Sequence, residues 1–210
     1  MSTITADSRV TEVVRTRGNL LRKLFEWGGF GAGAILIAFG VVAIVMGISG
    51  RSTVRSNLGQ EQIYFGNAAT DPTVPKQYSN QLVNTGAEAR AFAKMMRGHV
   101  LEATKGLTYA QMGRFVAKPG TPAKLTDGQG ATNDAKLALT DPKTGPVANP
   151  ARNIWVTETA LTTALNTSYM ADRLGLFGIV VGIALLLSGI GFIVLAFAAL
   201  HRPKTAALQR

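Results

Sequence analysis

The stretch from Leu174 to Leu200 constrains this chain more than any other part, because its 27 consecutive residues carry no charge. Seventeen of them are Leu, Ile, Val or Phe. About 20 apolar residues suffice for a helix to cross a bilayer. A helix in a soluble core would show a polar stripe, and this stretch has none. Residues 174–200 are therefore predicted to form a transmembrane helix.

A second uncharged segment, residues 28–48, lies near the N-terminus and follows positively charged residues. A cleaved signal peptide is the alternative interpretation of such a segment. Its apolar run is longer than the 7–15 residues of a typical signal peptide core, and no A-x-A cleavage site follows it. We therefore predict a retained transmembrane helix over 28–48.

Composition leaves room for one modest water-facing domain between the two spans. The chain has 22 Lys and Arg, 12 Asp and Glu, and a formal net charge of +10. These basic residues are dispersed along the sequence, which argues against a nucleic-acid partner. The absence of cysteine from the sequence excludes disulfides, thiolate metal sites and cysteine nucleophiles.

Charge near the spans predicts the orientation. The tail 1–27 carries five basic residues against three acidic ones, and the tail 201–210 carries three basic residues and no acid. Positive-inside counting gives most weight to short segments beside the spans, so both tails are predicted to be cytoplasmic. Residues 49–173 are then extracytoplasmic, although basic residues at both ends of this segment oppose the assignment. The expected location is the plasma membrane.

Both predicted spans carry glycine at every seventh position, and seven residues are close to two helical turns. Each set therefore lies on one stripe, where a neighbouring backbone can approach closely. Such a stripe predicts helix packing, either between the two spans of one chain or between protomers. The six glycines are Gly33, Gly40, Gly47, Gly175, Gly182 and Gly189.

The segment between the spans shows helical spacing at both ends. The first span is expected to continue a few turns beyond Arg51, and an amphipathic helix is expected over 85–116 with a break near Gly106. Residues 117–150 are rich in Gly, Pro, Thr, Asp and Asn, and are predicted to be irregular and mobile. Helical spacing returns from Ala151 and runs unbroken into the second span. The predicted fold is an all-α membrane protein with two transmembrane helices extended into an exported, hairpin-like helical domain with a long irregular loop.

Large apolar side chains on the two outer helices could line a groove for a ligand or a partner. The set is Phe92, Met96, Trp155 and Leu161. Aromatic residues at helical spacing also pack into ordinary hydrophobic cores, and we expect the core role to be the commoner one.

Four stretches carry a resemblance to a known family: 15–47, 50–54 (GRSTV), 102–115 (EATKGLTYAQMGRF) and 149–182. The chain resembles a family of two-span membrane proteins from high-GC actinobacteria. The resemblance covers both spans and both outer helices but not the irregular middle. Many members carry the label of aromatic ring-opening dioxygenase, which implies a non-haem iron site.

The residue inventory contradicts that label. Ring-opening dioxygenases of this kind need two histidines and a carboxylate on one face of the iron. The chain has two histidines in all, His99 in the predicted outer segment and His201 beyond the opposite end of the second span. The predicted topology keeps them apart. We therefore expect no enzyme activity, no catalytic or metal-binding residues and no cofactor.

The sequence thus favours a non-enzymatic, two-pass plasma-membrane protein that acts as an accessory or scaffold subunit. Its expected partners are the lipid bilayer and other membrane proteins or further copies of itself. The alternative is a membrane-anchored binder or sensor of a lipid or cell-envelope ligand. The two hypotheses differ in what they require, since only the second needs a groove in the outer domain.

Overall fold

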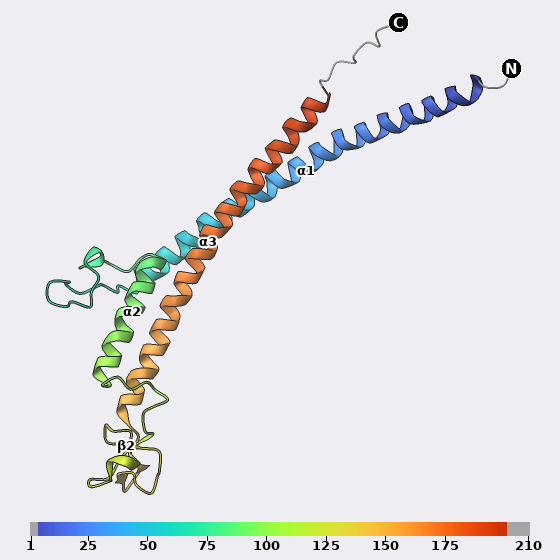
Figure 1. Ribbon diagram of the computed structural model, residues 1–210. Coiled ribbons are helices and arrows are strands. Elements are labelled where there is room, and N and C mark those ends of the chain that lie inside the picture. The colour runs from blue at the N-terminus through green and yellow to red at the C-terminus, as the bar shows by residue number, and fades with distance from the viewer. Residues whose placement is uncertain (1–3, 201–210) are drawn as a thin grey trace. The chain divides into compact units, whose positions relative to one another are not determined.

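The computed structural model describes residues 4–200, with side chains described for Lys23 and for 27–198. Helices make up 62% of the chain, which confirms the prediction of a mostly helical protein. In the described range the long elements are α1 (Ile4–Gln60), α2 (Gly86–Ala103) and α3 (Pro150–Leu200), as Figure 1 shows.

α1 and α3 each contain a segment that is long and apolar enough to cross a membrane. These segments are Trp27–Gln60 and Pro150–Ala198, and their most apolar windows have mean hydropathies of 2.5 and 2.8. Only 17% of each window is buried. A helix that is apolar on all sides is stable when a protein core or a bilayer covers it. Here the protein covers little of either helix.

The chain divides into two compact units. The first unit holds the part of α1 up to Gly50 and the part of α3 from Leu174 onward. The second unit is Arg51–Arg173. It contains the end of α1, all of α2, the start of α3 and the segments between them.

The start of α3 is defined by two neighbouring residues. Pro150 is the first helical residue, a position where its fixed φ is favourable and its missing N–H costs nothing. Asn149 precedes it, and the Asn149 side-chain oxygen accepts a hydrogen bond from the Ala151 N–H at 3.1 Å. Asparagine in this position caps the free N–H groups of a helix.

α2 is closed at both ends by local hydrogen bonds. Thr85 and Glu88 form a capping box, in which the Glu88 N–H donates to the Thr85 hydroxyl and the Thr85 N–H donates to the Glu88 carboxylate. At the other end, Gly106 adopts a φ of +84°, and its N–H donates to the Leu101 carbonyl at 2.7 Å. The helix that we expected over 85–116 therefore ends at Ala103, close to the expected break.

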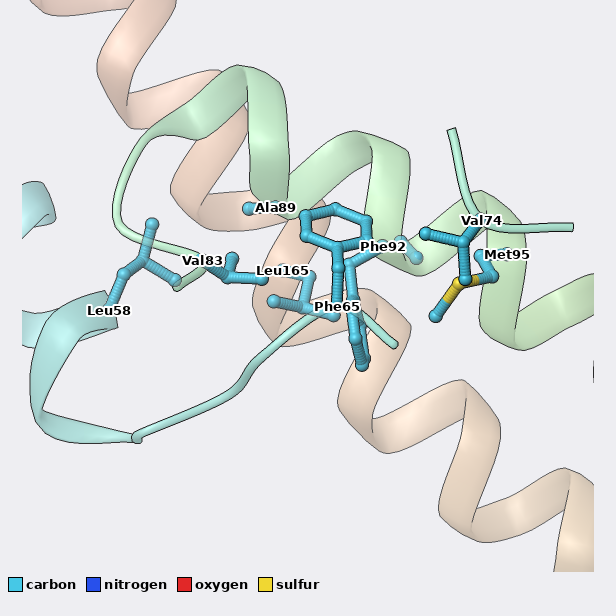
Figure 2. Close-up of a cluster of buried hydrophobic side chains, with 9 residues drawn as sticks. Leu58, Phe65, Val74, Val83, Ala89, Phe92, Met95 and Leu165 are labelled. Carbon is cyan, nitrogen blue, oxygen red and sulfur yellow. The ribbon is translucent and has the colours of Figure 1, made fainter. Parts of the chain in front are cut away.

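The main core of the second unit lies where the end of α1 and the loop that follows it meet α2 and α3 (Figure 2). Phe65, from that loop, stacks on Tyr78 and meets Phe92 of α2 edge-on, with ring centroids 5.2 and 5.3 Å away. Leu165 of α3 is 2% exposed. The buried members of this cluster are Leu58, Phe65, Val74, Val83, Ala89, Phe92, Ala93, Met95 and Leu165.

Residues 107–149, which we call the β cap, contain short antiparallel ladders. β1 (Phe115–Val116) pairs with β2 (Ala131–Thr132), and β3 (Thr140–Asp141) pairs with β4 (Gly145–Pro146). β1 lies at the end of the segment 85–116 that was predicted to be helical, and β2, β3 and β4 lie in the segment 117–150 that was predicted to be irregular. The segment buries few large side chains, so the hydrophobic pattern that signals a strand is absent from its sequence.

Side chains near the start of α3 attach the β cap to that helix. From α3, the Arg152 guanidinium donates to the Met112 carbonyl at 3.1 Å. The Trp155 indole N–H, also from α3, donates to the Leu107 carbonyl at 2.9 Å. Within the β cap, the side-chain amide of Asn149, the residue before α3, donates to the Gly113 carbonyl at 3.0 Å.

Asp127 organises the centre of the β cap. One of its carboxylate oxygens accepts from the Gly113 N–H at 2.9 Å, and the other accepts from the N–H groups of Gln129 and Ala131 at 2.9 and 3.0 Å. Burial raises the pKa of Asp127, but these backbone donors favour the charged form more strongly. The pKa of Asp127 is therefore lowered from its usual value of 3.8.

We expect Asp127→Asn to destabilise the protein by about 1–2 kcal/mol at pH 7. The three backbone N–H groups now share two carboxylate oxygens, whereas a neutral amide would offer them a single acceptor oxygen. A carboxylate with a lowered folded pKa stabilises the fold above the unfolded pKa of 3.8 and loses that contribution as pH falls through the lower folded value. Thermal unfolding at a series of pH values should show the two proteins converging as the pH falls below 3.8 and through the lowered folded pKa of Asp127. Asp134→Asn, at an exposed cap position, is the matched control. A difference that persists at acid pH would contradict the role of the Asp127 charge.

Candidate functional site

Three glycine pairs bring the backbones of α1 and α3 into contact in the first unit, and together they form what we call the glycine seam. A Cβ atom added to the α1 member of each pair would lie 2.5–2.7 Å from the carbonyl oxygen of its α3 partner. Real Cβ atoms essentially never come that close, so only glycine fits these positions. The pairs are Gly33 with Gly189, Gly40 with Gly182, and Gly47 with Gly175.

Branched side chains close the glycine seam from both helices. A Cβ on Gly182 would also lie 2.7 Å from the Ile44 side chain, and one on Gly33 would lie 2.7 Å from that of Ile193. Each glycine thus accommodates a branched side chain of the opposite helix. The structure therefore places the six glycines in a contact within one chain, so a contact between protomers through the same stripe would require this pair to separate.

The other faces of the two helices carry large apolar side chains that nothing in the described structure covers. Phe39 is 64% exposed and Leu195 is 67% exposed. Glycines away from the seam, such as Gly31 and Gly191, have no atom within 4 Å of an added Cβ. These faces are as apolar as the lipid tails that would surround a transmembrane helix.

The second unit contains an apolar groove of about 380 Å³ between α2 and α3, which we call the α2–α3 groove. Met96 and Leu161, which were predicted from the sequence as part of a ligand or partner surface, both line it. The full lining is Met96, Val100, Asn153, Ile154, Thr157, Glu158 and Leu161.

Phe92 and Trp155, the other two predicted surface residues, lie in hydrophobic cores. Phe92 is 8% exposed within the main core. Trp155 is 2% exposed and packs with Val100 and Met112. The Arg97 guanidinium covers the Trp155 ring at 5.1 Å from its centroid. The four predicted residues are therefore divided between the groove and the cores.

Glu158 was not selected from the sequence, and it is the most unusual side chain of the groove. It is 3% exposed, and its Oε1 is buried without a hydrogen-bond partner. Its Oε2 accepts one bond, from the Thr159 hydroxyl at 3.3 Å. An unsatisfied buried acceptor costs about 1–3 kcal/mol, and more when it is charged. The sequence did hold a signal, because Glu158 lies four residues after Ile154 and three before Leu161, on the apolar face of α3.

His99 joins α2 to the loop before it. Its Nε2 lies 2.7 Å from the Thr73 hydroxyl and 3.2 Å from an Asp71 carboxylate oxygen. The Thr73 hydroxyl and backbone N–H, followed by the charge of His99, lower the pKa of Asp71 from its usual value. His201, the other histidine, lies outside the described residues.

Within the described residues, no group of three or more His, Asp or Glu side chains could hold a metal ion.

Asp141 begins the sequence DPKTG, residues 141–145. It accepts hydrogen bonds from the N–H groups of Lys143 and Thr144 at 2.7 and 3.0 Å. These bonds lower the pKa of Asp141 and make the stretch a turn between β3 and β4.

Arginine side chains gather where the second unit begins and ends in the sequence. Arg51 pairs with the buried Asp172 at 2.9 Å. The Arg90 and Arg173 guanidinium groups lie over the Tyr169 ring, 4.6 and 5.1 Å from its centroid. The hydrogen bond with Arg90 is the main cause of the lowered pKa of Tyr169. These contacts give the ends of this unit a basic, aromatic character.

Comparison of the chain with known protein families, curated proteins and solved structures finds no match.

We expect Gly182→Leu to separate α1 from α3 in the first unit, because its Cβ would lie 2.7 Å from the Gly40 carbonyl oxygen and 2.9 Å from the Ile44 nitrogen. Overpacking of this kind costs about 1–3 kcal/mol or more. Thermal unfolding in lipid nanodiscs should show a lower midpoint. Gly191→Leu is the matched control on the same helix, since nothing lies within 4 Å of its added Cβ. Equal midpoints for the two variants would contradict the packing role of the glycine seam.

Proposed function

We propose that this protein is a two-pass plasma-membrane protein whose second unit, Arg51–Arg173, lies outside the cell while both tails lie in the cytoplasm. The observation that carries the proposal is the uncovered apolar surface of α1 and α3, of which only 17% is buried in the most apolar windows. Moving such apolar surface from water into a bilayer is favourable by a free energy of about 25 cal/mol per Å². The basic tails support the orientation.

Aromatic and basic residues next to the apolar segments also support a membrane setting. Trp27, 78% exposed, lies just before the predicted span 28–48. Tyr169, with its two arginines, lies shortly before the predicted span 174–200. Trp and Tyr are enriched at the two membrane interfaces, where an apolar ring and a polar edge are both accommodated.

Within that membrane setting, we propose a non-enzymatic role as an accessory or scaffold subunit. The glycine seam holds the two helices together through their small faces, which leaves the large apolar faces for lipid or for other membrane helices. The second unit adds a helical core and a hydrogen-bonded β cap, which would present a fixed surface outside the membrane. The proposed partners are other membrane proteins or further copies of this chain.

Single introduced cysteines test the orientation, because the natural sequence contains none. Lys124→Cys, at an exposed position of the β cap, should react with a membrane-impermeant maleimide in intact cells. Lys204→Cys should react only after the membrane is permeabilised. The reverse labelling pattern would show that the orientation is opposite to the one proposed. Labelling of both cysteines in intact cells would contradict the two-pass arrangement.

The accessory role predicts a stable complex. Expressed at its native level and extracted in a mild detergent, the protein should co-elute with a membrane partner or a second copy at a constant ratio through size exclusion. A two-span protein of unrelated sequence, tagged and expressed equally, is the control for chance association. A monomer that carries no partner under these conditions would contradict the proposal.

A second candidate function, a membrane-anchored binder of a small amphiphilic ligand, is favoured by one observation. The α2–α3 groove combines apolar walls with the unpartnered carboxylate oxygen of Glu158. Ligand sites are typically apolar clefts of about 300–1,000 Å³ with a few polar groups that fix orientation. The groove has this composition, and its volume of about 380 Å³ falls in this range.

A further inference from the structure

We propose that the α2–α3 groove binds an amphiphile with an unbranched apolar chain and a primary ammonium head group, and that Glu158 accepts hydrogen bonds from the head group. This inference rests on the second candidate function above, and it names the chemistry of the ligand.

The carboxylate of Glu158 is the reason for choosing a head group that donates hydrogen bonds. Oε1 is buried and has no partner, and Oε2 has one long bond to the neighbouring Thr159 hydroxyl. Rotation of the side chain toward the groove would bring Oε1 to a bound head group, which would provide the missing donor. An ammonium group has three donors, and a bond between charged groups is stronger than one between neutral groups.

The charges around the groove distinguish among head groups. Glu158 is the one ionisable side chain in the described lining of the groove, and Asn153 and Thr157 are neutral. Arg97, the residue after Met96 on α2, has its guanidinium over the Trp155 ring at 5.1 Å. Among the described residues, no cation forms an ion pair with Glu158. A cationic head group is therefore favoured over a carboxylate, which Glu158 would repel.

The apolar side chains that line the α2–α3 groove account for the alkyl chain of the proposed ligand. Met96 and Val100 lie one turn apart on α2, while Ile154 and Leu161 face them from α3. Ile154 is 43% exposed although it is a large apolar residue. A methionine adapts its shape to a flexible guest, because its side chain is unbranched and polarisable. An alkyl chain would cover these side chains without needing a partner for any polar atom.

Trp155 provides a reporter for binding in the full-length protein. The chain has two tryptophans, so Trp27→Phe leaves Trp155 alone. Trp155 packs against Val100, which also lines the groove. We would titrate this protein, in phosphatidylcholine nanodiscs, with octylammonium, octanol and octanoate, and follow the Trp155 fluorescence. Octylammonium should saturate at the lowest concentration, octanol at a higher one, and octanoate at the highest.

Two variants separate the head group from the chain. Glu158→Gln should weaken octylammonium binding by about tenfold to a hundredfold and leave octanol binding unchanged. Thr157→Phe, which fills the groove from an exposed position of α3, should weaken all three ligands. Glu102→Gln, a charge change at an exposed position of α2, is the matched control and should change nothing.

Stability and ligand source are measured in parallel. The melting temperature of Glu158→Gln should equal or exceed that of the parent, because the variant removes an unpartnered buried charge. Replacing part of the phosphatidylcholine with phosphatidylethanolamine should shift the octylammonium titration to higher concentration if the natural ligand is a membrane lipid. An unchanged titration assigns the site to a soluble amine.

The outcomes distinguish the inference from the function on which it rests. If octylammonium and octanol bind equally, and Glu158→Gln changes neither, the groove binds amphiphiles but the ammonium assignment is wrong. If none of the three ligands saturates, both the inference and the binder function are wrong. If Glu158→Gln changes only co-purification with another protein, Glu158 faces a basic side chain of that protein, which also overturns the inference.

Discussion

The close contact of two backbones at the glycine seam is the constraint on which the first unit depends. In a membrane, no hydrophobic force draws two apolar helices together, because lipid tails are as apolar as leucine. Packing at short range must supply the attraction instead, and dispersion forces fall steeply once a gap opens. Gly40 and Gly182 remove the Cβ atoms that would create such a gap. A sequence with alanine in both positions could still insert as two helices, but it would not pair them in this way.

The helices were predictable because their signals are local. An uncharged run longer than 20 residues, as over 174–200, needs no tertiary contact to be recognised. The β cap was not predictable, because Asp127 holds it through backbone donors on Gly113, Gln129 and Ala131, which have no hydrophobic period. Hydrogen bonds to the backbone depend on chain geometry rather than residue type, so composition alone made this segment look irregular.

The candidate groove was predictable in part. Helical spacing placed Phe92, Met96, Trp155 and Leu161 on inward faces, but it did not say which neighbour each would meet. Phe65 packs against Phe92 and is itself stacked on Tyr78, and both Phe65 and Tyr78 come from the segment between α1 and α2, whose path no periodicity predicts. Glu158 was missed because we selected large apolar residues. A charged residue on an otherwise apolar helix face carries more information than the apolar residues around it.

The attachment of the β cap to α3 has a consequence for the order in which the protein assembles. Residues 107–149 are made before α3, yet the carbonyl groups of Leu107 and Met112 accept hydrogen bonds from Trp155 and Arg152 of α3. Those bonds cannot form until the first turns of α3 have been synthesised and have coiled. The cap must therefore remain incomplete while the chain behind it emerges, and it is finished by residues that lead into the second apolar helix. Closure of the cap thus follows synthesis of the start of α3 in the maturation of the chain.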